Sequence, residues 1–145
     1  MEQRKVLLVE DNPQDEKLTL RALRKLNLAN EIDVVRDGAE ALDYLWRRNA
    51  FAELRDEPLP AVVLLDIKLP KLSGIDVLGE LRAHDATRIL PVVMLTSSDE
   101  DRDMIASYRN GANSYVRKPV DAGEFAAAVG QLGVYWLALN ELPNH

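Results

Sequence analysis

Carboxylate side chains stand at the ends of two apolar runs in the sequence. Glu10 and Asp11 follow the run KVLLV, and Asp66 ends the run AVVLLD. A charge at the end of a buried run costs free energy unless a partner or a ligand compensates it. Three clustered carboxylates repel one another and therefore need a cation. Hard oxygen ligands without histidine or cysteine suit Mg2+, with Mn2+ as an alternative, rather than zinc.

A hydroxyl and an ammonium group end two further apolar segments. Thr96 closes PVVMLT, and Lys118 lies near the end of NSYVRKP. Together with a metal ion these groups can bind a phosphoryl group, and a carboxylate can accept one as an aspartyl-phosphate. Asp66 is the expected nucleophile. Each residue alone has an ordinary explanation as a helix cap, a turn residue or a surface lysine, so the prediction depends on their joint placement.

The elements that must position these residues alternate between apolar runs and segments of helical period. The sequence predicts strands at 5–10, 31–37, 61–66, 91–96 and 113–119, and helices at 15–28, after Gly38, at 73–84, 99–110 and 121–142, with a polar loop at about 49–60. This alternation indicates an α/β protein with a five-stranded parallel sheet. Right-handed crossovers place helices on both faces, which makes a three-layer, doubly wound fold.

Sites in doubly wound folds lie at the C-terminal edge of the sheet, near the switch point in strand order. For the order 2-1-3-4-5, the first and third strands are neighbours at that point. The three carboxylates, Glu10, Asp11 and Asp66, then converge within a few ångströms, flanked by Thr96 and Lys118.

Composition limits the classes of protein that the chain can belong to. It has 145 residues, a net charge of −6 and no cysteine, which favours one globular domain without disulfides or thiolate metal sites. The acidic balance argues against a nucleic-acid binder and a polybasic membrane anchor. Without an apolar run of about 20 residues or a signal peptide, the protein is expected to be cytoplasmic.

Four segments resemble the receiver domain of two-component response regulators: LLVEDNP, LLDIKLPKLSG, VVMLTSS and YVRKP. The resemblance extends over nearly the whole chain. It implies the flavodoxin-like fold of the chemotaxis response regulator, as a single receiver domain over residues 1–145 with a core at about 4–130 and an extension at about 131–145. It also implies Mg2+-dependent phosphotransfer from a histidine kinase to an aspartate.

The resemblance assigns a role to each residue of the acidic site. Asp66 matches the phosphoacceptor, and Glu10 and Asp11 match the acidic pair, in which Asp11 is the more direct metal ligand. The backbone carbonyl of Lys68 matches the third protein ligand to the metal. Lys118 matches the lysine that pairs with the phosphate, and its peptide bond to the following proline is often cis in the family.

Other matched residues belong to the expected switch and to the loop after Asp66. Thr96 matches the switch hydroxyl and Tyr115 the switch aromatic, while Pro70 and Gly74 match the loop. Two positions vary within the family. The cationic side chain of Lys68 could change the lifetime of the acyl phosphate, and Ser97, where many members carry alanine, could alter water access.

The C-terminal segment EFAAAVGQLGVYWLALNELPNH resembles that of small stand-alone regulators that partner phytochrome-type histidine kinases, including bacteriophytochromes. Those proteins are often homodimers through this extended helix region. An apolar surface suited to a dimer would comprise Val134, Tyr135, Trp136, Leu139 and Leu142. The alternative is that the two aromatic residues fold back on their own domain.

The leading hypothesis is a bacterial signalling switch that accepts phosphate, and that can catalyse its own phosphorylation and dephosphorylation, rather than a metabolic enzyme. With no output domain expected, it would signal through contacts with partner proteins. A phosphate-ester hydrolase would usually carry a second aspartate where Lys68 stands, and a binding module that had lost phosphorylation would normally lack part of the site. Trp46 and His84 are expected to be structural, and with the terminal His145 they offer no phosphohistidine site.

Overall fold

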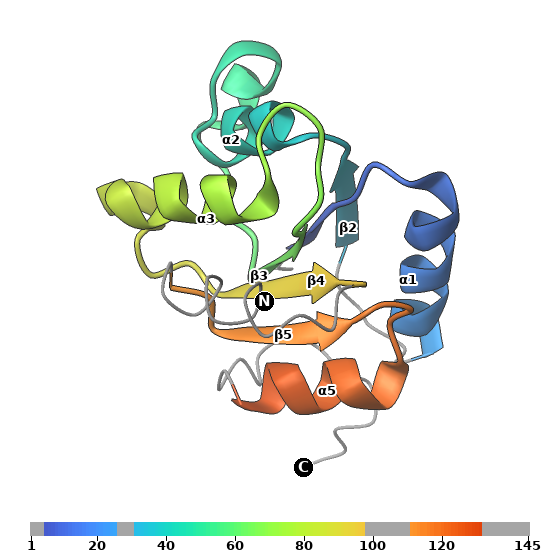
Figure 1. Cartoon of the computed structure of the whole chain (residues 1–145). Coiled ribbons are helices and arrows are strands. Elements are labelled where there is room, and N and C mark those ends of the chain that lie inside the picture. Colours follow the sequence, from blue (N-terminus) through green and yellow to red (C-terminus); the bar gives the residue numbers. More distant parts are fainter. Residues whose placement is uncertain (1–4, 26–30, 98–110, 132–145) are drawn as a thin grey trace.

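The computed structural model describes residues 5–25, 31–97 and 111–131 of the chain. These residues form five strands, four α-helices and two short 3-10 helices, arranged in three layers (Figure 1). In chain order the elements are β1 (Lys5–Val9), α1 (Pro13–Lys25), β2 (Glu31–Val35), α2 (Gly38–Leu45), η1 (Asn49–Leu54), β3 (Val62–Asp66), α3 (Gly74–Ala83), η2 (Asp85–Thr87), β4 (Val92–Thr96), β5 (Ser114–Arg117) and α5 (Ala122–Gln131).

The sheet has the predicted order, β2-β1-β3-β4-β5, and every neighbouring pair is parallel. Strand β1 therefore lies between β2 and β3, and the chain reverses its direction of winding there. In the register of the sheet, Val9 lies opposite both Val35 and Leu65. The residues that follow these positions emerge together at the C-terminal edge, so the predicted fold class and strand order are confirmed.

Two apolar layers cover the sheet, one on each face. On one face, Val6 and Leu8 of β1 pack with Leu23 of α1 and Phe125 of α5. On the other face, Leu7 and Val9 pack with residues of α2 and α3, the two helices at the top of Figure 1. Strands β3 and β4 are buried at every position. Burial on both faces explains why the strands read as continuous apolar runs rather than as alternating ones.

Helix starts follow their capping residues. Ser73, the predicted cap, accepts a hydrogen bond from the backbone N–H of Asp76 at 3.1 Å. Helix α1 begins at Pro13, a residue type that suits the first turn of a helix, and the Asn12 side chain accepts hydrogen bonds from the N–H groups of Gln14 and Asp15. The predicted loop at 49–60 contains the 3-10 helix η1.

Trp46 and His84 have structural contacts. Their rings lie 4.0 Å apart between centroids, and the Trp46 indole N–H donates to the Thr87 hydroxyl at 3.3 Å. His84 is the C-cap residue of α3. The predicted helix at 99–110, the predicted dimer surface and His145 lie outside the described residues. Among the helices that are described, none is both long and apolar enough to cross a bilayer.

Gly74 offers a test of how tightly the loop after β3 is packed. A Cβ at this position would overlap the carbonyl oxygen of Asp66 and lie 2.9 Å from the Ile67 Cα. Because both obstacles are backbone atoms, Gly74→Ala should lower the free energy of unfolding by at least about 2 kcal/mol, measured by urea denaturation.

Gly123→Ala is the matched control, since its Cβ would meet only a side-chain oxygen, Asp121 Oδ1, at 3.1 Å. It should leave the stability within about 1 kcal/mol of the wild type. Equal effects of the two substitutions would contradict the close approach at Gly74.

Candidate functional site

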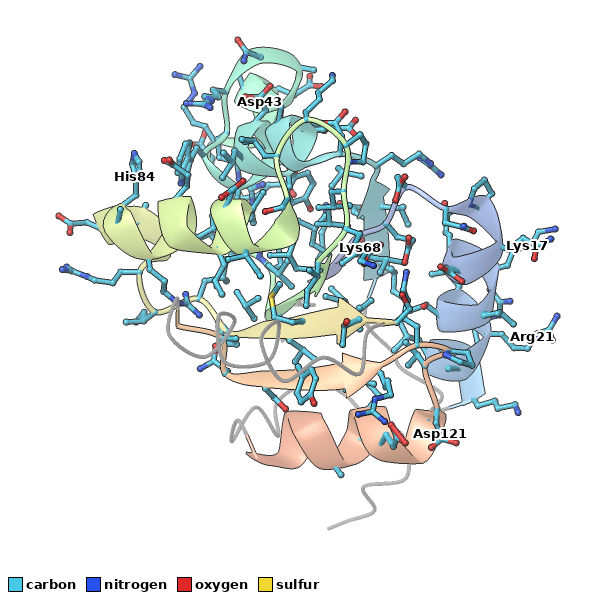
Figure 2. The ribbon with its side chains drawn as sticks, in the orientation of Figure 1. Lys17, Arg21, Asp43, Lys68, His84 and Asp121 are labelled. Carbon is cyan, nitrogen blue, oxygen red and sulfur yellow. The ribbon has the colours of Figure 1, made fainter. Side chains whose placement is uncertain are left out.

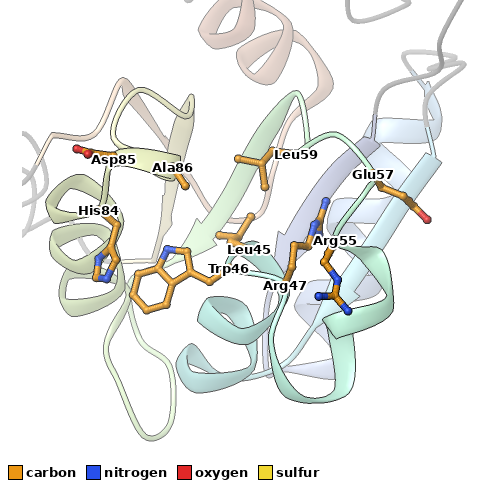
Figure 3. A pocket seen from close by; sticks show the side chains of 9 residues that line it. All are labelled: Leu45, Trp46, Arg47, Arg55, Glu57, Leu59, His84, Asp85 and Ala86. Atoms are coloured by element: carbon orange, nitrogen blue, oxygen red, sulfur yellow. The ribbon is translucent and has the colours of Figure 1, made fainter.

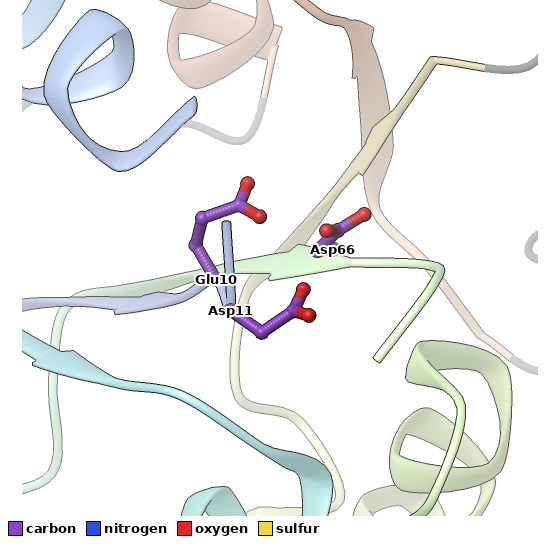
Figure 4. A group of neighbouring side chains, drawn as sticks. All are labelled: Glu10, Asp11 and Asp66. Carbon is purple, nitrogen blue, oxygen red and sulfur yellow. The ribbon is translucent and has the colours of Figure 1, made fainter. Parts of the chain in front are cut away.

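Three carboxylates meet at the C-terminal edge of the sheet (Figure 4). One oxygen atom of each of Glu10, Asp11 and Asp66 lies within 4.8 Å of the others. Glu10 is fully buried and Asp66 is 3% exposed, whereas Asp11 is exposed to solvent. The sheet register brings them together, since β1 and β3 are adjacent and end at the same level. The predicted convergence of these residues is therefore observed, and we call them the acid cluster.

The ammonium group of Lys118 lies against this cluster. Its Nζ is 2.9 Å from Glu10 Oε1, 3.1 Å from Asp66 Oδ2 and 2.8 Å from Asp15 Oδ2. The Lys118 side chain is 8% exposed, so all three contacts form in a largely water-free environment. The peptide bond from Lys118 to Pro119 is cis, as the resemblance suggested.

Burial and charge shift the ionisation of the two most enclosed groups. Burial raises the pKa of Glu10 to about 7, against the opposing effect of the Lys118 hydrogen bond. For Lys118, burial alone would lower the pKa, but the hydrogen bonds to Asp15 and Glu10 outweigh burial and raise it. Lys118 is therefore firmly charged. A second cation beside the cluster would favour the ionised carboxylates further.

The acid cluster has the donor set of a divalent metal site. Its oxygens are hard ligands, one of them is open to solvent, and no sulfur or imidazole ligand accompanies them in the cluster. Mg2+ and Mn2+ prefer such a set and keep part of their water shell. The backbone N–H of Lys68 donates to Asp66 Oδ1 at 3.2 Å, which fixes the turn after the strand. The side chain of Lys68, labelled in Figure 2, is exposed to solvent.

The two predicted switch residues lie on β4 and β5. Thr96 is the last residue of β4 and is 2% exposed, and its carbonyl accepts the backbone N–H of Lys118 at 2.7 Å. Tyr115 is half-buried on β5 and packs against the core layer formed by α2 and α3. Thr96 thus borders the Lys118 backbone, whereas Tyr115 lies two residues before the end of its strand.

Asp15 is a site residue that the sequence analysis missed. It stands in the first turn of α1 and makes the shortest of the three carboxylate contacts to Lys118. The available signal was its position: the first turn of the helix after the acidic pair must start at the same edge of the sheet. Asn12, also missed, caps that helix and donates its N–H to Glu10 Oε2 at 3.2 Å.

A separate hollow of about 400 Å³ lies at the opposite edge of the sheet (Figure 3). Its lining includes residues at the C-terminal ends of α2 and α3. Because the helices in this fold run opposite to the strands, these ends lie at the N-terminal edge of the sheet. Trp46, His84 and Leu59 contribute to its walls, and no member of the acid cluster does. The residues predicted to form the phosphoryl site therefore do not line this hollow.

Replacing the buried lysine tests how far it stabilises the acid cluster. Lys118→Met removes the cationic side chain that pairs with both Glu10 and Asp66, so without divalent cations the free energy of unfolding should fall by about 3–5 kcal/mol. Mg2+ should then stabilise this variant more than the wild type, because the metal no longer competes with an ammonium group.

Lys5→Met is the matched control for thermal denaturation with and without Mg2+. Lys5 also pairs with two carboxylates, Asp33 and Glu57, but at the start of β1 and with 24% of its side chain exposed. Its loss should cost about 1 kcal/mol or less and leave the Mg2+ response unchanged. If Mg2+ stabilised the Lys118 variant no more than the wild type, the prediction that Mg2+ binds at the acid cluster would be contradicted.

Comparisons with known proteins agree with this arrangement. The response regulator receiver domain family matches residues 6–130. The solved structure of the bacteriophytochrome response regulator AtBRR has a TM-score of 0.87 and 52% identity, covering 97% of this chain and 99% of that one. The probable methanogenesis regulatory protein FilR2 of Methanothrix harundinacea is 39% identical over 139 residues, 96% of this chain and 87% of the relative.

A third relative has been solved with a metal. The response regulator Rcp1 of Synechocystis is 33% identical over 138 residues, 95% of this chain and 92% of its own length. Its Mn2+-bound structure has a TM-score of 0.75 and 32% identity, covering 97% of this chain and 99% of that one. Sheet order, acid cluster and family match agree: the chain belongs to the response regulator receiver domain family of two-component systems and is related to the phytochrome response regulators.

Proposed function

We propose that this protein is a phosphoacceptor of a two-component system that takes a phosphoryl group on Asp66 in an Mg2+-dependent reaction. The observation that carries the proposal is the contact between Lys118 and the acid cluster. It sets a cation and metal-binding oxygens around one largely buried carboxylate. That environment suits phosphoryl transfer, which depends mainly on positioning and on neutralising charge.

In the transfer step an oxygen of Asp66 attacks the phosphorus atom of a phosphohistidine. The new P–O bond forms as the P–N bond breaks, and the imidazole nitrogen keeps the electron pair and takes up a proton. Glu10, Asp11, Asp66 and the Lys68 carbonyl would hold Mg2+, which would supply positive charge to the phosphoryl oxygens. Lys118 donates to those oxygens from the side of β5, and the buried position of Asp66 limits attack by water on the product.

The proposal includes a switch and a partner kinase. Thr96 and Lys118 move to meet the phosphoryl group, and Tyr115 carries the change to the surface near β5, which shifts the population between two states. The kinship with bacteriophytochrome response regulators supports a sensor histidine kinase of the phytochrome type as donor. Signalling through protein contacts, with homodimerisation through residues 131–145, completes the proposal.

The two other candidate functions have less support. A phosphate-ester hydrolase would need an acid–base group beside the nucleophile, where this chain has the exposed Lys68. A module that had lost phosphorylation would have no use for a buried lysine held on three carboxylates.

Incubation with Mg2+ and acetyl phosphate tests the phosphoacceptor directly. Intact-mass measurement should show one phosphoryl adduct that requires Mg2+, survives acid and is lost in base. Asp66→Asn should abolish this adduct, since an amide oxygen is too weak a nucleophile to form the acyl phosphate.

Asp85→Asn is the matched control, because Asp85 has a side chain that is 90% exposed and pairs only with Arg88 among the described residues. It should be phosphorylated like the wild type. An adduct that persists in Asp66→Asn, or no adduct in a folded wild-type protein, would refute the assignment of Asp66.

A further inference from the structure

Lys118 has no donor left for a new ligand. An ammonium group carries three N–H donors, and Lys118 directs hydrogen bonds to Glu10 Oε1, Asp66 Oδ2 and Asp15 Oδ2. A phosphoryl oxygen on Asp66 can therefore gain a full hydrogen bond from Lys118 only if one of these contacts opens. One of the three carboxylates must therefore release its hydrogen bond to Lys118.

The three carboxylates differ in how easily they can leave. Glu10 is fully buried, so water could not replace the hydrogen bond that its carboxylate would lose on leaving Lys118. Asp66 is the acceptor and carries the incoming group. The Asp15 side chain is 32% exposed and lies outside the acid cluster, so it can turn into water at a much smaller desolvation cost.

Release of Asp15 leaves its helix intact. Asn12 caps α1 through its side chain, which accepts the Asp15 backbone N–H at 3.1 Å, and its carbonyl accepts the Glu16 N–H at 2.9 Å. Neither bond involves the Asp15 carboxylate. Once free, that carboxylate still lies in the first turn of α1, where the helix dipole favours negative charge.

We propose that Asp15 is a displaceable partner of Lys118. In the unphosphorylated protein the Asp15 carboxylate accepts the hydrogen bond that Lys118 would otherwise donate to a phosphoryl oxygen, and it is expelled when Asp66 is phosphorylated. This inference rests on the proposed phosphoacceptor function. Asp15 is thus a positioning residue that favours the resting state, both by holding Lys118 and by repelling the incoming anion. Its release also links the state of Asp66 to the first turn of α1.

The proposal gives opposite signs for two measurements on the same variant. Asp15→Asn should bind beryllofluoride, an analogue of the phosphoryl group, about three- to tenfold tighter at saturating Mg2+, as expected for removing one partly screened charge nearby. The same variant should melt at a lower temperature without Mg2+ and beryllofluoride, because Lys118 loses a charged partner. Calorimetric titration and thermal denaturation measure the two effects.

Glu16→Gln is the matched control. Glu16 lies next to Asp15 in the same helical turn, and its substitution removes the same charge. The Glu16 carboxylate, however, pairs with Arg36 at 3.0 Å. Its affinity for beryllofluoride should stay within about twofold of the wild type, since its charge is not on Lys118. Asp15→Ala, which also removes the acceptor atom, should shift the affinity at least as far as Asp15→Asn.

The outcomes separate this inference from the proposed function. If the wild type binds beryllofluoride and Asp15→Asn binds it equally or more weakly, Asp15 is a spectator or a support for Lys118, and displacement is wrong. A parallel fall in affinity and melting temperature would indicate that structural support. If the folded wild type fails to bind beryllofluoride at all, the phosphoacceptor function fails, and the inference fails with it.

Discussion

The contact between one buried ammonium group and three carboxylates is the interaction on which the rest of this structure depends. Lys118 follows β5, Glu10 follows β1, Asp66 ends β3 and Asp15 lies in α1. Four elements, of which only β1 and α1 are consecutive in the chain, are thereby held at one edge of the sheet. The strand order β2-β1-β3-β4-β5 brings Glu10, Asp66 and Lys118 to that edge, and without the lysine the same order would bring the carboxylates together with no ammonium group to compensate them.

The same physics explains why the charges stand where they do. Apolar layers cover both faces of the sheet, so a charged side chain within β3 would lie in the core with no partner. The strand end is the first position where a carboxylate can reach a cation and water. Asp66 therefore ends a buried run because the run places it at that edge, with the Lys68 N–H and the Lys118 ammonium as its neighbours.

Much of this arrangement could be predicted from the sequence, because the strands are continuous apolar runs and their end residues carry the chemistry. The strand order and the convergence of Glu10, Asp11, Asp66 and Lys118 were confirmed. Asp15 was missed because a carboxylate in a first helical turn has an ordinary explanation in the helix dipole. Only the direction of its side chain towards Lys118 distinguishes it. The role of Asn12 as the cap of α1 was missed for a similar reason, since it depends on the direction of the Asn12 side chain.

The saturated lysine also indicates how such a site can be both stable and responsive. If the buried lysine contacted fewer carboxylates, part of the negative charge of the acid cluster would have no nearby cation. If all three of its carboxylate partners were buried, none could leave the lysine at low cost, and the lysine could not bind a new anion. Here two partners are almost inaccessible to water, and the third is partly exposed on a different element. The difference in desolvation cost ranks the contacts by how readily they open. A new negative group on Asp66 therefore meets a lysine that exchanges its most exposed partner first, and α1 is the element that experiences the exchange.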